Sequence, residues 1–226
     1  MIFRKIKNIY FVGIGGIGMS GIAELLMNLN FVVSGSDLIE NDNVQRLKNL
    51  GVKIFIGHNP ENLKNSDVLV YSSAIPLENS EIIKAKQLGI PIIKRAEMLG
   101  ELINLKETSI AIGGTHGKTT TSSMIGTMLT HAKKDPTLVV GGLVQNLDTN
   151  SKLGTGDLIV VEADEFDRSF LALKPTIAII NNIELEHTDC YRDLDDLEQT
   201  FLKFCNSVPF YGSVIINIDS ISTKNI

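Results

Sequence analysis

Short apolar runs rich in β-branched residues alternate along this chain with longer segments in which apolar residues recur at helical spacing. In the first hundred residues, strands are predicted at 8–12, 31–33, 52–56, 68–71 and 90–93. Helices are predicted between them at 17–29, 43–50 and 79–88, with a closing helix at 96–105. Such alternation predicts a parallel sheet with helices on both faces.

The second half of the chain repeats this design. Strands are predicted at 109–112, 138–140, 158–162, 176–180 and 214–217, and helices at 118–131 and 194–206. The fold class is therefore α/β, with a Rossmann-like domain over residues 1–105 and a P-loop-type domain over residues 106–226. The chain leaves its last strand with no compact ending, so the second domain is expected to be truncated or to finish in a ragged tail.

A glycine-rich segment at residues 113–121 follows one predicted strand and opens a helix. Such a turn presents backbone N–H groups and a helix N-terminus to phosphate. Lys118 would reach the terminal phosphates, and the Thr119 hydroxyl would ligate magnesium. The Walker pattern has a glycine where Ile112 stands, and the alternative is a glycine-rich turn with an ordinary surface lysine. The predicted ATP-binding residues are Gly114, Thr115, His116, Gly117, Lys118, Thr119 and Thr120.

A second glycine loop lies near the start of the chain, where Gly13, Gly15 and Gly18 form a G-x-G-x-x-G pattern between a strand and a helix. The first glycine permits the tight turn, the second lets the backbone approach a diphosphate, and the third lets helix pack on strand. Asp37 ends the next strand, where a ribose-binding acid is expected. The pattern indicates a nucleotide diphosphate more than NAD, and the alternative is a tight turn that binds nothing.

Carboxylates follow the apolar run at 158–162. Glu162 still belongs to that run, and burying it is costly unless it is paired or bound to a metal. Strand ends beside a phosphate loop are where α/β proteins place magnesium ligands. We therefore interpret Glu162 as a magnesium ligand, whereas Asp167 fits a solvated acidic loop equally well.

His187 stands in a similar context, after the run at 176–180 and the pair Asn181 and Asn182. Acidic residues surround it in the sequence, namely Glu184, Glu186 and Asp189. This favours a magnesium-linked role for the histidine, although magnesium prefers oxygen ligands. His58 and His131 lack such surroundings and are interpreted as ordinary.

Composition narrows the function classes. The 226 residues are 43% hydrophobic and carry a net charge of −5, which argues against a general nucleic-acid binder. No stretch has the length and apolarity of a membrane span, and residues 1–7 lead into a strand rather than a secretory leader. Cys190 and Cys205 have no metal-like spacing, so free thiols in a reducing cytoplasm are expected.

Several motifs, taken in order, resemble those of the Mur ligase family over nearly the whole chain. They are residues 13–23, 34–37, 71–75, 95–100 and 114–121, then 162–165 with Asp167, Ser169 and Phe170, and 182–184 with His187. The resemblance implies a cytoplasmic, ATP-dependent amide ligase of peptidoglycan precursor synthesis, and thus a role in cell shape and division. Among family members it favours the one that joins L-alanine to the lactyl carboxylate of UDP-N-acetylmuramate through an acyl phosphate.

The same resemblance implies roles for individual residues. Lys118, Glu162 and His187 would be catalytic. Thr119 and Glu162 would hold one Mg²⁺, and His187 would help to hold a second Mg²⁺ nearer the acyl phosphate. The UDP substrate would be bound by Gly15, Gly16, Gly18, Asp37, Ser72, Ser73, Asp164, Glu165 and Ser169. His116 is a further candidate beside the substrate. No nucleic acid or membrane partner is implied, and the oligomeric state is left open.

Two departures from the family pattern bear on function. Glu186 stands where the family usually has aspartate, which could shift His187 slightly. Family members are also considerably longer, with a third α/β domain that carries the amino-acid site. A chain of this length is therefore expected not to ligate, but to bind the UDP sugar and, at most weakly, ATP. The alternatives are a sister ligase that adds a preformed peptide, an NAD-binding Rossmann protein, and a non-catalytic interaction module.

Overall fold

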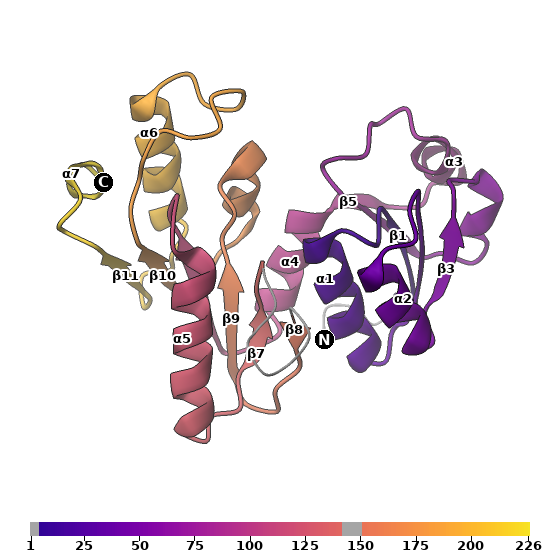
Figure 1. The fold of residues 1–226 in the computed structure, drawn as a ribbon, viewed down its shortest axis with the longest axis horizontal. Coiled ribbons are helices and arrows are strands. Elements are labelled where there is room, and N and C mark those ends of the chain that lie inside the picture. The colour runs from indigo at the N-terminus through magenta and orange to yellow at the C-terminus, as the bar shows by residue number, and fades with distance from the viewer. Residues whose placement is uncertain (1–4, 142–150) are drawn as a thin grey trace. The chain divides into compact units, whose positions relative to one another are not determined.

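The computed structural model describes residues 5–141 and 151–226, which fold into two compact units. The first unit ends at Met98 and the second begins at Leu99, whereas the sequence placed the division near residue 105. Each unit has its own sheet flanked by helices (Figure 1). Residues 1–4, part of the segment considered as a leader, lie outside the described ranges.

The first unit is a five-stranded parallel sheet of order β3-β2-β1-β4-β5. Its strands are β1 (Asn8–Val12), β2 (Val32–Asp37), β3 (Lys53–Ile56), β4 (Val68–Tyr71) and β5 (Ile92–Lys94). Its helices are α1 (Ile17–Asn28), α2 (Asp42–Asn49), the 3₁₀ turn η1 (Pro60–Leu63) and α3 (Ser80–Leu88), while the division between the two units falls within α4 (Arg95–Ile103). Strand order reverses between β1 and β4, and sheets of this kind bind ligands at the carboxyl ends of strands beside such a switch point.

The second unit holds a six-stranded sheet of order β11-β10-β6-β9-β7-β8. Its strands are β6 (Thr108–Gly113), β7 (Thr137–Val139), β8 (Ser151–Lys152), β9 (Leu158–Glu162), β10 (Ile177–Ile180) and β11 (Ser213–Ile216). Its helices are α5 (Lys118–His131), the 3₁₀ segment η2 (Phe166–Ala172), α6 (Leu194–Cys205) and α7 (Ile221–Lys224). All pairs are parallel except β7 with β8, which confirms the predicted mostly parallel α/β class.

Every predicted strand and helix is present, with ends displaced by a few residues. The elements that the sequence did not predict are η1, β8, η2 and α7, each too short for hydrophobic periodicity to define. Side-chain caps account for several helix starts, since Asn41, Asn79 and Asp193 each accept a backbone N–H from the first turn. Within the described ranges, no helix has the length and apolarity needed to cross a membrane.

A fully buried carboxylate lies in the first unit, on α3. Glu81 is 0% exposed and accepts from Tyr10 Oη at 2.7 Å and Ser36 Oγ at 2.5 Å. His58 Nδ1 lies 3.0 Å from the same carboxylate, and Asn62 Nδ2 donates at 3.2 Å. Burial raises the pKa of Tyr10 well above its ordinary value, so its hydroxyl keeps its proton and donates. His58, interpreted from sequence as ordinary, thus belongs to a polar network inside the unit.

Gly35 in β2 marks a point where two backbones approach closely. A Cβ there would lie 2.5 Å from the Phe11 carbonyl oxygen and 2.9 Å from Ile14 Cδ1. The Phe11 backbone cannot move away from an added Cβ without disturbing the sheet. We therefore expect Gly35→Ala to lower the free energy of unfolding by about 2 kcal/mol. Urea unfolding would measure this, with Gly16→Ala as the matched variant, since a Cβ at Gly16 meets nothing closer than 3.5 Å. Equal effects of the two substitutions would contradict the packing argument.

Candidate nucleotide and phosphate site

The loop after β6 is shaped by two glycines with positive φ. Gly114 has φ +126° and Gly117 has φ +78°, conformations that glycine adopts without steric cost. A Cβ on Gly114 would also lie 3.0 Å from the Asn182 carbonyl oxygen. Gly117 caps α5 with no side-chain hydrogen bond, so the first-turn N–H groups of this helix keep their capacity for an anion.

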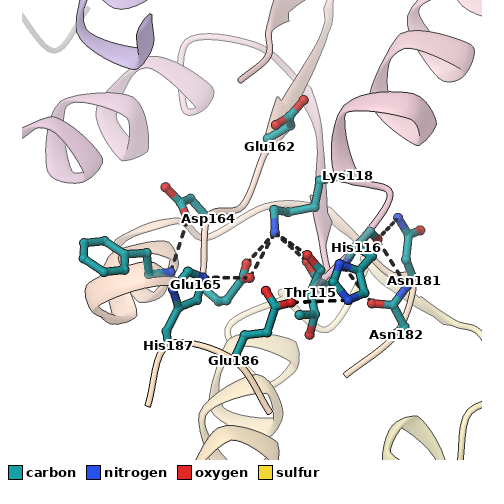
Figure 2. Close-up of polar contacts among 12 residues, drawn as sticks. Thr115, His116, Lys118, Glu162, Asp164, Glu165, Asn181, Asn182, Glu186 and His187 are labelled. Atoms are coloured by element: carbon teal, nitrogen blue, oxygen red, sulfur yellow. Dashed lines mark hydrogen bonds and ion pairs between the residues drawn. The ribbon is translucent and has the colours of Figure 1, made fainter. Parts of the chain in front are cut away.

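The ammonium of Lys118 turns back over this loop (Figure 2). It donates to the carbonyls of Gly114 at 2.7 Å and Thr115 at 3.2 Å. It also contacts both carboxylate oxygens of Glu165, at 2.7 and 3.0 Å. Glu165 is only 2% exposed, and Tyr191 Oη donates to its carbonyl at 2.5 Å. The sequence predicted Lys118 as a phosphate ligand but did not pair it with Glu165, for which it predicted a substrate contact.

Thr119 and Glu162 meet as the magnesium hypothesis requires. The Thr119 hydroxyl lies 3.2 Å from Glu162 Oε2, and Ser122 Oγ donates to Oε1 at 3.0 Å. Glu162 ends β9 half-buried, and a Cβ on Gly141 would meet its Oε2 at 2.6 Å. One hydroxyl and one carboxylate suit Mg²⁺, which takes few protein oxygens and completes its shell with water and phosphate.

His187 does not join that pair. Its Nε2 lies 3.7 Å from Glu165 Oε1, and its ring packs edge-on against Phe166 at 5.2 Å between centroids. The residue itself has φ +53°, a left-handed conformation that is costly outside glycine. In the part of the chain that the structure describes, no three His, Cys, Asp or Glu side chains gather into a metal site. The structure therefore brings His187 to Lys118 through Glu165, not to Glu162.

Two asparagines after β10 fix the phosphate loop. Asn182 Oδ1 accepts from the His116 N–H at 2.8 Å, and its Nδ2 donates to the His116 carbonyl at 3.2 Å. Asn181 Nδ2 donates to the same carbonyl at 3.3 Å. The His116 ring is half-exposed, with Nε2 at 3.4 Å from Glu186 and 3.6 Å from Glu184 (Figure 2). Glu186, the departure from the family pattern, thus faces His116.

A cavity of about 470 Å³ opens beside this loop. Isoleucines of β10 and β11 supply its apolar lining, and asparagines and the loop supply its polar lining. The lining includes Ile179, Ile215, Asn181, Asn217, Thr121 and His116. A mixture of apolar and polar lining groups is common in sites that bind small molecules.

The predicted substrate residues of the second unit lie in one turn after β9. Asp164 Oδ1 accepts from the Phe166 N–H at 3.2 Å, and Ser169 Oγ donates to the Asp164 carbonyl at 3.1 Å. Asp167 is exposed and Arg168 half-exposed, and both have φ +55°, a strained pair that the sequence did not predict. The Arg168 guanidinium donates to Asp196 at 2.6 Å, which anchors the turn to α6.

Burial raises the pKa of the Cys205 thiol, on the same helix α6, to about 11.

The glycine loop of the first unit is held by a hydrogen bond to Asp37, at the end of β2. Gly13 has φ +80°, as its tight turn requires, and the Gly15 N–H donates to Asp37 Oδ2 at 2.7 Å. The Asn41 and Asn43 amides donate to the Gly15 carbonyl at 3.1 and 3.0 Å. The sequence expected Asp37 to bind a ribose and Gly15 to face a diphosphate. In the structure these two residues bind each other and fix the loop.

The other candidates of that loop lie at the same edge of the sheet. Gly16 is open, since a Cβ there would meet nothing closer than 3.5 Å. Gly18 was expected to let helix pack on strand, but a Cβ there would meet the Arg95 guanidinium at 2.8 Å. Ser72 and Ser73 follow β4, where the Ser72 N–H donates to the Val12 carbonyl at 3.2 Å. The candidates after β1, β2 and β4 are thus neighbours at the switch point of the sheet.

Comparison with known proteins gives consistent matches. Residues 8–107 match the family model described as "Mur ligase family, catalytic domain", and residues 112–226 match "Mur ligase middle domain". A UDP-N-acetylmuramate–L-alanine ligase of Sulfurihydrogenibium sp. is 55% identical over 98% of this chain and 49% of its own length. One from Aquifex aeolicus is 52% identical over 97% of this chain and 48% of its own length. The chain thus spans about half the length of these curated relatives.

Solved structures agree with the sequence matches. The UDP-N-acetylmuramate–alanine ligase MurC of Thermotoga maritima superposes with a TM-score of 0.87 at 30% identity, over 97% of this chain and 51% of that one. A Neisseria UDP-N-acetylmuramate:L-alanyl-γ-D-glutamyl-meso-diaminopimelate ligase superposes with a TM-score of 0.89 at 28% identity, over 97% of this chain and 74% of that one. The fold and the order of the two units are therefore shared with both kinds of ligase.

Proposed function

Because this chain belongs to the Mur ligase family, we propose that it is the nucleotide-binding part of an ATP-dependent UDP-N-acetylmuramate–L-alanine ligase. The observation that carries the proposal is the pair of phosphate-type loops, each at the carboxyl edge of its own parallel sheet. Identity of 50–55% to curated relatives of that name supports the choice of substrate. The activity would place the protein in the cytoplasm, in peptidoglycan precursor synthesis.

The second unit would bind ATP and activate a carboxylate. The N–H groups of residues 114–120 and the N-terminus of α5 would hold the phosphates, with Lys118 stabilising the transferring phosphoryl group. Magnesium, held by Thr119 and Glu162, would supply neutralising charge on the β- and γ-phosphates. The γ-phosphoryl group would pass to the lactyl carboxylate, and the L-alanine amine would then displace phosphate from the acyl phosphate. His187 would act beside Glu165, near the acyl phosphate.

The cavity beside the phosphate loop is suited to the base of ATP. Ile179 and Ile215 would stack against a planar ring, while Asn181 and Asn217 can each donate and accept hydrogen bonds at its edge. This arrangement supports ATP as the nucleotide of the second unit.

The first unit would bind the UDP part of the sugar substrate. Gly16 leaves room above the loop, and Gly15, Gly18, Asp37, Ser72 and Ser73 surround the same edge of the sheet. The predicted contacts of His116, Asp164, Glu165 and Ser169 with the sugar and carboxylate would come from the second unit. Glu165 is the weakest of these, since Lys118 already occupies its carboxylate.

A second candidate is a ligase that joins a preformed peptide to the same UDP sugar. The Neisseria structure supports it, because that ligase superposes on this chain with a TM-score of 0.89, as well as the Thermotoga enzyme does at 0.87. Among the residues proposed here, none selects between an amino acid and a peptide. In a protein that also carries the amino-acid site, competition between L-alanine and the tripeptide would separate the two candidates.

The proposal is tested by thermal unfolding of this chain with UDP-N-acetylmuramate, Mg-ATP or NAD, each added alone. A ligand at about a hundredfold excess over its dissociation constant stabilises the native state by about 2.7 kcal/mol. We expect the UDP sugar and Mg-ATP to raise the melting temperature and NAD to leave it unchanged. Stabilisation by NAD alone would favour the dinucleotide-binding alternative, and no effect of any nucleotide would favour an interaction module.

A further inference from the structure

We propose that Glu165 is a positioning residue that holds Lys118 in a resting state, taking the place of a nucleotide phosphate until ATP displaces it. The inference rests on the proposed function, because it assumes that the loop at residues 114–120 binds ATP. It assigns Glu165 to the control of nucleotide affinity rather than to contact with the UDP sugar.

The donors of Lys118 are fully used. An ammonium has three protons, and Lys118 Nζ lies within 3.2 Å of four acceptor atoms, two carbonyls and both oxygens of Glu165. A phosphate oxygen can therefore reach Lys118 only if one of these acceptors is released. The carboxylate is the acceptor that a phosphate would replace, since two anions on one ammonium repel each other whereas neutral carbonyls do not.

Burial and a backbone hydrogen bond restrict the position of Glu165. Its side chain is 2% exposed, and Tyr191 Oη holds its backbone carbonyl at 2.5 Å. The strained turn at Asp167 and Arg168 follows directly and is anchored to Asp196. The backbone that carries Glu165 is thus anchored, so we expect its carboxylate to stay in place and the ion pair to break when Lys118 moves toward a ligand.

His187 provides a partner for Glu165 after the exchange. Its Nε2 lies 3.7 Å from Glu165 Oε1, close enough for a small ring rotation to form a hydrogen bond (Figure 2). A buried carboxylate without any partner would be costly, so this second contact makes the exchange feasible. The resting pair lowers affinity for ATP, because each binding event must break it.

The test is calorimetric titration of this chain with Mg-ATP at one pH, using Glu165→Gln, which keeps the shape and removes the charge. We expect affinity to rise about tenfold while the melting temperature of the ligand-free protein falls, because Lys118 loses its partner. If Glu165 had only a structural role, its replacement would lower both the affinity for Mg-ATP and the melting temperature. Asp195→Asn is the charge control, since Asp195 is exposed on α6, and its affinity for Mg-ATP should equal that of the unmodified chain.

A gain in affinity for Mg-ATP could come from loss of the ion pair or from loss of a negative charge near the phosphates. The Glu165→Asp variant distinguishes these causes and remains informative if the glutamine variant fails to fold. It keeps the charge but withdraws the carboxylate by one methylene from Lys118, so an intermediate gain in affinity supports the inference. Unchanged or weaker binding by Glu165→Asp, or by Glu165→Gln, overturns it. Failure of the unmodified chain to bind Mg-ATP would overturn the proposed function as well, whereas normal binding without a gain overturns only the role of Glu165.

Discussion

Replacing Lys118 with methionine is expected to weaken Mg-ATP binding by about a hundredfold or more and to leave UDP-N-acetylmuramate binding unchanged. Charge-assisted hydrogen bonds to phosphate are worth roughly 1.5–3 kcal/mol, and methionine cannot form them. The substitution also removes the ammonium that neutralises the buried carboxylate of Glu165, which adds repulsion toward the incoming phosphates. These two effects act in the same direction, so their combined size is the largest expected for any single change in the second unit.

Calorimetric titration with Mg-ATP and with the UDP sugar would measure this effect. Lys174→Met is the matched control, because it removes an equal charge from an exposed position of the same unit. Lys118→Arg should not restore affinity, since a planar guanidinium cannot place three donors as a compact ammonium does. Full Mg-ATP affinity in the methionine variant would remove Lys118 from the phosphate site.

Replacing Glu81 with alanine is expected to lower the stability of the first unit by about 4 kcal/mol or more. The change leaves the buried donors of Tyr10, Ser36 and Asn62 without their acceptor and creates a cavity. Glu81→Gln should cost roughly half as much, because the amide keeps one acceptor oxygen but points two donors at groups that also donate. Glu78→Gln, at an exposed position of the preceding loop, should change stability by less than about 0.5 kcal/mol.

Hydrogen exchange followed by peptide is the suitable measurement. Amides of β1 and β2 report the opening of the first unit, while amides of β6 and β9 provide an internal reference. Faster exchange in the first pair alone is the expected result. Unaltered protection of β1 and β2 in Glu81→Ala would show that the network contributes little to the stability of the unit.

The strands and helices were predictable because their apolar spacing is local. Parallel strands then bring their carboxyl ends together, so the meeting of Thr119 with Glu162 also followed from the sequence. The pairing of Lys118 with Glu165 did not follow, because 47 residues separate them and Glu165 lies directly before a strained turn at Asp167 and Arg168. No local pattern encodes that turn.

Glu81 illustrates a different limit. Near the start of a polar helix, after Asn79, it has the pattern of a solvated residue. Its burial depends on η1 and on the end of β2, which supply donors from distant parts of the chain. Gly15 and Asp37 show another limit. Their spacing predicted contacts with a diphosphate and a ribose, whereas in the structure the Gly15 N–H donates to the Asp37 carboxylate.

The hydrogen bonds around Gly15 have a kinetic consequence. Asp37, Asn41 and Asn43 hold the glycine loop in one shape through the protein's own hydrogen bonds, so we expect a ligand to bind a preformed surface without ordering a segment. Association would then proceed at a rate set by diffusion and charge, with little ordering entropy lost. Ligands that share a diphosphate would arrive at similar rates, and the time each one stays bound would distinguish them.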